Sequence, residues 1–120
     1  MHELYPAELL AHARSSTYRK VVADATSQSL LHHPSCGDQI SYTVRIKDGL
    51  IEEIGFQGAG CMLSQAAASF LADYLHHRPQ AAITALGDED FLQLLNIKLG
   101  PTRATCALLP LKAVRRLLAE

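Results

Sequence analysis

The chain has 120 residues, of which 48% are hydrophobic and 19% charged, and its formal net charge is −1. This composition is typical of a soluble globular protein, and no basic block exceeds a pair, so we expect neither a nucleic-acid nor a membrane partner. The N-terminus has no basic start and no apolar core of a signal peptide, so we expect a single domain over residues 1–120, located in the cytoplasm.

Three cysteines are present, and this odd number disfavours a closed disulfide framework. In a reducing compartment, free cysteines are buried fillers, metal ligands or reactive thiols. The position of each cysteine relative to the predicted helices and strands is therefore the main guide to its role.

The first part of the chain is predicted to contain little regular structure. A short amphipathic pattern over residues 8–13 predicts a helix, and Pro6 suits its first turn. Val21 and Val22 favour a short strand or an extended segment. Residues 24–28 are polar and are predicted to form a loop.

A β-hairpin is the clearest prediction from local pattern. Residues 40–46 alternate apolar and polar side chains, which is typical of a half-buried strand. Asp48-Gly49 is a strong signal for a tight turn, and residues 50–56 return as a second strand. The alternation is imperfect at Glu52-Glu53, which allows a β-bulge there.

Two glycines, Gly58 and Gly60, stand just before Cys61 and predict a tight backbone that leads into a helix over residues 62–77. Cys61 would then lie at the start of this helix. Free N–H groups and the helix dipole stabilise a thiolate at that position. Packing alone does not require glycines at this spacing.

The C-terminal half is predicted to be helical. Short helices are predicted over residues 80–86 and 91–96. The last helical segment, within residues 102–120, contains Pro110, which cannot sit deep inside a regular helix. Either the regular helix begins near Pro110 or it is bent there, and both options place Cys106 near a helix start.

The segment Pro34-Ser35-Cys36-Gly37-Asp38 lies where a loop becomes the first strand of the hairpin. Cys36 and Asp38 are two residues apart, so their side chains share one side of an extended backbone. Together with Cys61 and Cys106 they offer three thiolates and a carboxylate, enough for one tetrahedral zinc or for an iron–sulfur cluster. No Cys-x-x-Cys pair is present, and from spacing alone three small buried cysteines are an equal alternative.

Other polar residues are weaker candidates. His76-His77 is expected at a helix C-terminus, where a capping or cationic role is favoured, and His32-His33 is expected in a solvated loop. Ser64 and Ser69 are interpreted as packing positions, and residues 88–90 as a solvated helix start. No Ser-His-Asp arrangement, phosphate loop or dinucleotide fingerprint is present.

Three motifs are shared with a known family. Residues 34–38 match Pro-x-Cys-Gly-Asp, and residues 58–69 match Gly-x-Gly-Cys followed by a helix of small residues. Residues 103–109 match a cysteine that follows a basic residue at the start of the last helix. In these motifs and their order, the sequence resembles the U-type iron–sulfur assembly scaffolds IscU, SufU and the N-terminal domain of NifU, from about Leu4 onward.

This resemblance implies an α+β fold of the SufE/NifU-like type, in which helices pack on a three-stranded antiparallel sheet. It implies that Cys36, Asp38, Cys61 and Cys106 are the metal-site residues. By the same likeness, Cys36 would be the SufU-type and Cys106 the IscU-type persulfide acceptor. The protein would then be a scaffold or sulfur acceptor rather than a classical enzyme.

The chain departs from the family pattern at three places. IscU-type members have a histidine just before the third cysteine, whereas Thr105 stands there, as in SufU. SufU-type members carry an insertion between the second and third cysteines, whereas the connection over residues 81–99 is closer to IscU length. Residues 99–103, Leu-Gly-Pro-Thr-Arg, are a degraded match to the IscU chaperone-recognition segment Leu-Pro-Pro-Val-Lys, which disfavours recognition by that chaperone.

Three functions follow as alternatives. In the first, a cysteine desulfurase passes persulfide sulfur to the protein, and a [2Fe–2S] cluster is built at the site and handed to apo iron–sulfur proteins. In the second, the protein is a zinc-containing SufU-type sulfur acceptor that stimulates a cysteine desulfurase, with zinc at the same residues. In the third, it is a non-catalytic interaction module whose cysteines are structural.

Overall fold

The computed structural model of the chain describes residues 6–32 and 38–118. No helix in these two ranges is long and apolar enough to cross a membrane. In chain order the elements are α1 (Ala7–Arg14), β1 (Ser27–His32), β2 (Gln39–Lys47), β3 (Leu50–Ala59), α2 (Met62–Leu75), α3 (Ala81–Ala85), α4 (Asp88–Leu95), α5 (Pro101–Arg115) and the 3-10 turn η2 (Arg116–Leu118).

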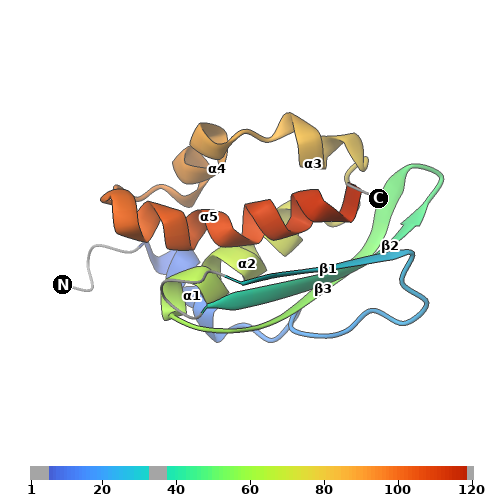
Figure 1. Cartoon of the computed structure of the whole chain (residues 1–120), viewed down its shortest axis with the longest axis horizontal. Coiled ribbons are helices and arrows are strands. Elements are labelled where there is room, and N and C mark those ends of the chain that lie inside the picture. The colour runs from blue at the N-terminus through green and yellow to red at the C-terminus, as the bar shows by residue number, and fades with distance from the viewer. Residues whose placement is uncertain (1–5, 33–37, 119–120) are drawn as a thin grey trace.

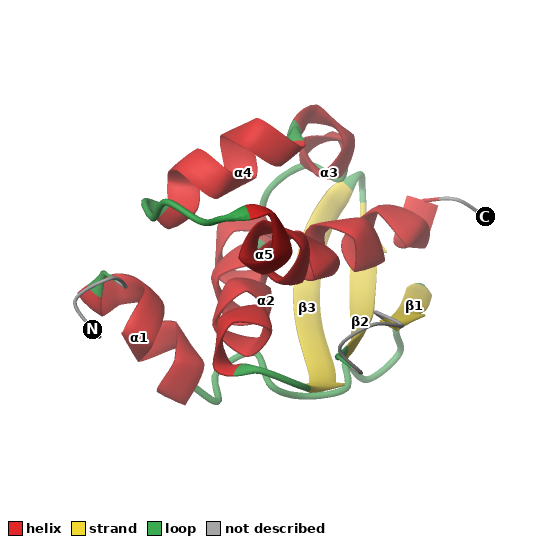
Figure 2. Ribbon diagram, turned by 60° about the vertical axis from the view of Figure 1, so that its left-hand side comes forward, coloured by secondary structure: helices red, strands yellow, loops and turns green. Residues whose placement is uncertain are grey.

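The three strands form one antiparallel sheet in the order β1-β2-β3 (Figure 1). Helices α2 and α5 pack on one face of this sheet, and α1 packs against α2. Helices α3 and α4 lie on the side of α5 that faces away from the sheet (Figure 2). The predicted α+β fold, a three-stranded antiparallel sheet with helices packed on it, is confirmed.

The hairpin of β2 and β3 has the turn and the bulge that its sequence indicates. Asp48 and Gly49 have φ angles of +55° and +77°, and two positive φ angles are typical of a type I′ turn. Arg45 pairs with Glu53 but the next residue, Ile46, pairs with Ile51. The residue between, Glu52, is therefore the extra residue of a β-bulge.

The loop predicted over residues 24–28 is wrong at its C-terminal end, because Ser27 and Gln28 open strand β1 and pair with β2. β1 lies at an edge of the sheet, and Gln28 is exposed between two half-buried serines. Ser29 Oγ donates a hydrogen bond to the carbonyl of Ala113 in α5 at 2.7 Å. Polar contacts therefore hold the start of β1 in place. Because these contacts do not require apolar side chains, the sequence shows no alternating pattern there.

Several helix boundaries also differ from the prediction, and α4, for example, begins at Asp88 rather than at residue 91. Helix α2 ends at Leu75 rather than at residue 77, because His76 is its extended C-cap and His77 has a φ angle of +70°. Helix α5 begins at Pro101, where a proline suits the first turn, and it continues through Pro110. A helix start near Pro110 is therefore wrong.

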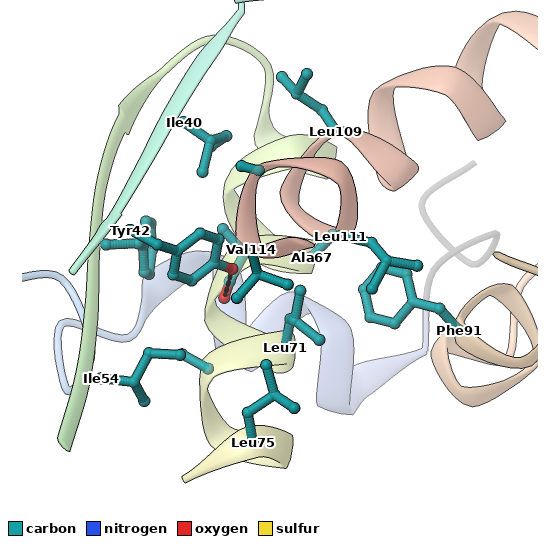
Figure 3. Packing of buried hydrophobic residues seen from close by; sticks show 14 of the residues in the cluster. Ile40, Tyr42, Ile54, Ala67, Leu71, Leu75, Phe91, Leu109, Leu111 and Val114 are labelled. Carbon is teal, nitrogen blue, oxygen red and sulfur yellow. Dashed lines mark hydrogen bonds between the residues drawn. The ribbon is translucent and has the colours of Figure 1, made fainter. Parts of the chain in front are cut away.

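The hydrophobic core lies between the sheet and helices α2 and α5 (Figure 3). Alternate side chains of β2 and β3 point toward the helices, because the side-chain period of a strand is two residues. Tyr42 is fully buried here, and its hydroxyl donates to the carbonyl of Ala68 in α2 at 2.7 Å. Other core residues labelled in Figure 3 come from all of these elements and from α4: Ile40, Ile54, Leu71, Leu75, Phe91, Leu111 and Val114.

The other face of the sheet is crossed by the connection over residues 16–26. The backbone N–H of Val22 donates to Oγ1 of Thr43 in β2 at 2.9 Å, and Val22 is buried by this contact. Gly55 permits the close approach, since a Cβ at that position would overlap the backbone of Lys20. This connection therefore covers part of the sheet face that carries no helix.

Candidate metal centre

Asp38, Cys61 and Cys106 come together from three separate parts of the chain. Asp38 directly precedes β2, Cys61 lies between β3 and α2, and Cys106 lies in α5. Each offers one ligand atom, and these three atoms all lie within 4.8 Å of one another. Helices α2 and α5 pack against each other, and this packing brings the two thiols to the same place.

Cys61 is the N-cap residue of α2, at the helix start that its sequence predicts. Its backbone is extended, and its Sγ accepts a hydrogen bond from the backbone N–H of Ser64 at 3.5 Å. The first N–H groups of a helix have no partner inside the helix, and the helix dipole favours negative charge at this end. The start of α2 therefore provides the Cys61 sulfur with a backbone hydrogen-bond donor.

Asp38 is a buried carboxylate, only 3% exposed, that faces Cys61 with both oxygens. Oδ1 accepts a hydrogen bond from the backbone N–H of Cys61 at 3.1 Å, and Oδ2 lies 3.5 Å from the Cys61 Sγ. One oxygen thus satisfies a backbone donor at the start of α2, while the other is directed toward the sulfur.

Gly58 and Gly60 are needed for close backbone approaches beside this carboxylate. Gly60 has a φ angle of +140°, and a Cβ there would overlap the carboxyl group of Asp38. Gly58 belongs to β3, and a Cβ there would overlap the carbonyl of Gln39. Both glycines thus permit a close approach, Gly58 near the end of β3 and Gly60 directly after the strand.

Cys106 is half-buried and lies in the second turn of α5, five residues after Pro101, rather than before a helix that starts near Pro110. Cys61 and Cys106 open onto one pocket of about 410 Å³, whose other lining residues are Met62, Leu63 and Arg103. The pocket therefore combines two thiols with apolar walls and one guanidinium group.

Cys36, the fourth predicted ligand, lies outside the described residues, as does His33. Thr105, which stands where a histidine occurs in IscU-type members, is exposed. Its hydroxyl donates to the carbonyl of Pro101, one turn earlier in the same helix, at 2.9 Å. The Thr105 side chain is therefore engaged with its own helix.

The weaker candidates occupy structural positions. His76-His77 is at the opposite end of α2 from Cys61, and the His76 ring lies 3.2 Å from the Tyr18 hydroxyl and 3.4 Å from Glu53. Asp88 opens α4 and forms an ion pair with Arg115 at 2.9 Å. None of these residues belongs to the group of Asp38, Cys61 and Cys106 found among the described residues.

Ser64 is the residue whose involvement the sequence did not indicate. It is fully buried, as expected of a packing position, but its N–H and its hydroxyl both contact Cys61. Its place three residues after the N-cap is the available signal, since this is where N-cap side chains find their backbone donor.

The donor set of two thiols and one carboxylate fits zinc, which takes sulfur and oxygen ligands in a tetrahedral site, and it also fits iron–sulfur ligation through the thiolates. The buried Asp38 carboxylate supports this fit, because a buried negative group is costly unless it is paired or bound to a metal. A metal at this position would be held by residues from both sheet and helices.

The chain is similar in sequence to iron–sulfur cluster assembly scaffold proteins. The iron–sulfur cluster assembly scaffold protein IscU of Streptococcus pyogenes is 32% identical over 88 residues, covering 73% of this chain and 55% of that protein. IscU of Thermotoga maritima is 34% identical over 70 residues, covering 58% of this chain and 49% of that protein. The matches thus span about half the length of these two relatives.

A longer match is to the zinc-dependent sulfurtransferase SufU of Bacillus subtilis, 25% identical over 136 aligned positions that cover 98% of this chain and 90% of that protein. Among solved structures, a candidate SUF-system scaffold protein from Fervidobacterium islandicum superposes with a TM-score of 0.83 at 18% identity, over 98% of each chain. A NifU-like protein (N-terminal) from Brucella abortus gives a TM-score of 0.78 at 18% identity, over 98% of this chain and 93% of that one.

The family model of the NifU-like N terminal domain matches residues 5–120, which is nearly the whole chain. This match agrees with the fold, with the named relatives and with the motifs around Asp38, Cys61 and Cys106. The chain therefore belongs to the family of NifU-like N terminal domains, as its cysteine motifs predict.

Proposed function

We propose that this protein takes part in iron–sulfur cluster assembly and that Cys36, Asp38, Cys61 and Cys106 form its working site. The observation that carries the proposal is the convergence of Asp38, Cys61 and Cys106, whose ligand atoms lie within 4.8 Å of one another. Sulfur ligands beside a carboxylate suit both iron and zinc, and the relatives named above are scaffolds and a sulfurtransferase.

The first step of this function is sulfur acceptance from a cysteine desulfurase. A thiolate of this chain attacks the outer sulfur of the donor's persulfide, so that a new S–S bond forms and the donor cysteine leaves as a thiolate. Cys36 and Cys106 are the candidate acceptors. The position of Cys106 on the 410 Å³ pocket supports its candidacy, because an incoming persulfide needs space beside the thiol.

The cargo of the assembly function is a [2Fe–2S] cluster, which the protein would build from the accepted sulfur and iron and pass to apo iron–sulfur proteins. Thiolates hold such clusters firmly, whereas a carboxylate is a harder and weaker ligand for them. Asp38 would therefore keep the cluster exchangeable. We place this activity in the cytoplasm, without nucleic-acid or membrane partners.

A second function, zinc-dependent sulfur acceptance, is favoured by Thr105 and by the match to SufU over 98% of this chain. In this form Cys36, Asp38, Cys61 and Cys106 hold zinc, which keeps its thiol ligands deprotonated and stabilises the fold when bound. The short connection between Cys61 and Cys106, closer to IscU length, weighs against it.

One experiment separates these functions. The purified protein is mixed with a cysteine desulfurase and cysteine, with and without added iron, and persulfide is located on individual cysteines by mass spectrometry. Iron-dependent growth of visible cluster absorption supports assembly, whereas stimulated turnover without iron by a zinc-loaded protein supports the second function. Protein that carries neither zinc nor iron and accepts no sulfur contradicts both, and leaves the non-catalytic interaction module.

A further inference from the structure

Ser64 is a fully buried polar residue on the alanine-rich helix α2. Its hydroxyl donates to the carbonyl of Cys61 at 3.1 Å and lies 3.8 Å from the Cys61 Sγ. Its backbone N–H donates to the same sulfur at 3.5 Å. All three contacts therefore involve the residue that begins the helix.

These contacts fix the orientation of Cys61. The Cys61 carbonyl accepts from the Ser64 hydroxyl and also from the backbone N–H of Gln65 at 3.2 Å, so the peptide group after Cys61 is held by two donors. On the other side of the residue, the Cys61 N–H is held by Asp38 at 3.1 Å. The direction of the Cα–Cβ bond is thus set from both sides.

The consequence is a sulfur that already faces its neighbours. The Cys61 Sγ lies 3.5 Å from Oδ2 of Asp38, and the Cys106 sulfur lies within 4.8 Å of the Cys61 sulfur and of one Asp38 carboxylate oxygen. Pre-orientation of a ligand reduces the side-chain freedom that metal binding would otherwise have to remove.

We propose that Ser64 is a positioning residue of the metal centre, which holds Cys61 in the orientation that directs its sulfur toward Asp38 and Cys106. This inference rests on the proposed function, because it takes these three residues as metal ligands. It assigns Cys61 the role of the pre-oriented ligand, distinct from the candidate sulfur acceptors Cys36 and Cys106.

The same helix offers a matched control. Ser69 is also fully buried, but its hydroxyl contacts Nδ1 of His12 in α1 at 2.8 Å, away from the cysteines. Ser64→Ala and Ser69→Ala therefore delete the same group from equally buried positions of one helix. Alanine suits a helix interior, so both variants are expected to fold without metal. Thermal unfolding of the metal-free variants tests this expectation.

The test is cobalt(II) binding to the apo proteins, measured by competition with a chromophoric chelator and by the thiolate-to-cobalt absorption. Residues that orient metal ligands typically contribute about 10- to 100-fold to affinity. We expect Ser64→Ala to weaken cobalt binding by at least about ten-fold and to alter the absorption spectrum. Ser69→Ala is expected to match the wild type in both measurements, and Ser64→Thr, which keeps the hydroxyl, to recover most of the affinity.

A folded Ser64→Ala protein with the cobalt affinity and spectrum of the wild type overturns the inference. An equal loss of cobalt affinity in Ser69→Ala also overturns it, because the loss would then come from a general weakening of α2. If Ser64→Ala does not fold, Ser64→Thr and Ser64→Val give the same comparison, since they share a shape and differ in the hydroxyl. Equal cobalt affinity in that pair also overturns it. Wild-type protein that binds no cobalt contradicts the proposed function itself, so the two failures are distinguishable.

Discussion

Asp38 combines a structural task with the proposed chemical one. Its carboxylate is buried and accepts the backbone N–H of Cys61, and it also faces the Cys61 sulfur. A hydrogen bond between a carboxylate and a helix N-terminus is stronger than one between neutral groups. The same contact that places Cys61 at the start of α2 thus places an oxygen ligand beside it.

Asp38→Ala is expected to slow the release of a bound cluster, because removal of the weak oxygen ligand leaves only thiolates. The measurement is the rate of cluster transfer to an apo-ferredoxin, followed by absorbance. The apo variant should also lose about 1–3 kcal/mol of stability, since the N–H of Cys61 loses its acceptor. Glu89→Ala, which removes an exposed acid from α4, is the control. If Asp38→Ala loses its cluster faster than this control does, Asp38 is not the ligand that keeps the cluster exchangeable.

Gly60→Ala is expected to disrupt the site more than the fold of the hairpin. Alanine would be strained at the φ angle of +140°, and its Cβ would overlap the Asp38 carboxylate. Gly49→Ala is the matched control, because Gly49 also has a positive φ, +77°, but faces open space. In urea unfolding, Gly49→Ala should lower the free energy of unfolding by roughly 1–2 kcal/mol, and it should bind cobalt as the wild type does. Gly60→Ala should lower the free energy of unfolding further and should bind cobalt weakly. Equal behaviour of the two variants would contradict this account.

At the scale of elements, Tyr18 joins the connection over residues 16–26 to both α2 and β3. Its hydroxyl donates to Asp73 in α2 at 3.0 Å and lies 3.2 Å from His76, whose ring reaches Glu53 in β3. The backbone carbonyl of Tyr18 accepts from the N–H of Phe56 at 2.8 Å. One residue therefore connects three segments at the end of α2 opposite to Cys61.

Tyr18 predicts a specific loss of stability in alkali. Burial and the hydrogen bond to Asp73 raise the pKa of Tyr18 to about 12, from a usual value of 10.0. Because the folded protein holds the phenol proton more tightly than the unfolded chain, this stabilisation is complete below about pH 10 and is lost as the pH rises toward about 12.

Urea unfolding over this pH range measures the effect. The free energy of unfolding of the wild type should fall more steeply with pH than that of Tyr18→Phe, which has no proton to lose at this position. Tyr42 also has a raised pKa from burial, but it is present in both proteins and so cancels from the comparison. Parallel pH dependences of the wild type and Tyr18→Phe would contradict the prediction.

Elements were predictable from the sequence where local chemistry decides the structure. Asp48-Gly49 and the alternation of β2 predict the hairpin, and the interrupted pattern at Glu52-Glu53 of β3 predicts its bulge. Strand β1 was not placed, since its polar start depends on pairing with β2 and on the Ser29 contact with α5. Of the two options for α5, a start near Pro110 is wrong, because the buried Pro110 lies inside the helix despite its local helix-breaking tendency.

The site was predictable to a similar degree. Asp38, Cys61 and Cys106 could be named from their motifs, and the glycines before Cys61 indicated a close approach. What Gly60 approaches, the Asp38 carboxylate, depends on tertiary structure. Ser64 could not be identified, since a serine on an alanine-rich helix has the same pattern whether its hydroxyl contacts a ligand or, as Ser69 does, a neighbouring helix.

At the scale of the whole molecule, the candidate metal centre links parts of the chain that fold on different elements. Asp38 precedes β2, Cys61 joins β3 to α2, and Cys106 lies in α5. A metal bound by all three would connect the sheet to both core helices, and unfolding would have to release it. An unfolded chain does not hold these residues together, so metal binding should stabilise the folded state.

We therefore expect zinc to raise the free energy of unfolding, by about 2.7 kcal/mol when free zinc is about 100 times its dissociation constant. Thermal unfolding with zinc and with a chelator gives the shift. Cys106→Ala should unfold at nearly the temperature of the chelated wild type, because Cys106 is only half-buried, and should show little response to zinc. Ser69→Ala should unfold at a lower temperature yet keep the full zinc shift, since it leaves Asp38, Cys61 and Cys106 in place. A full zinc shift in Cys106→Ala would mean that the metal does not join α5 to the rest of the molecule.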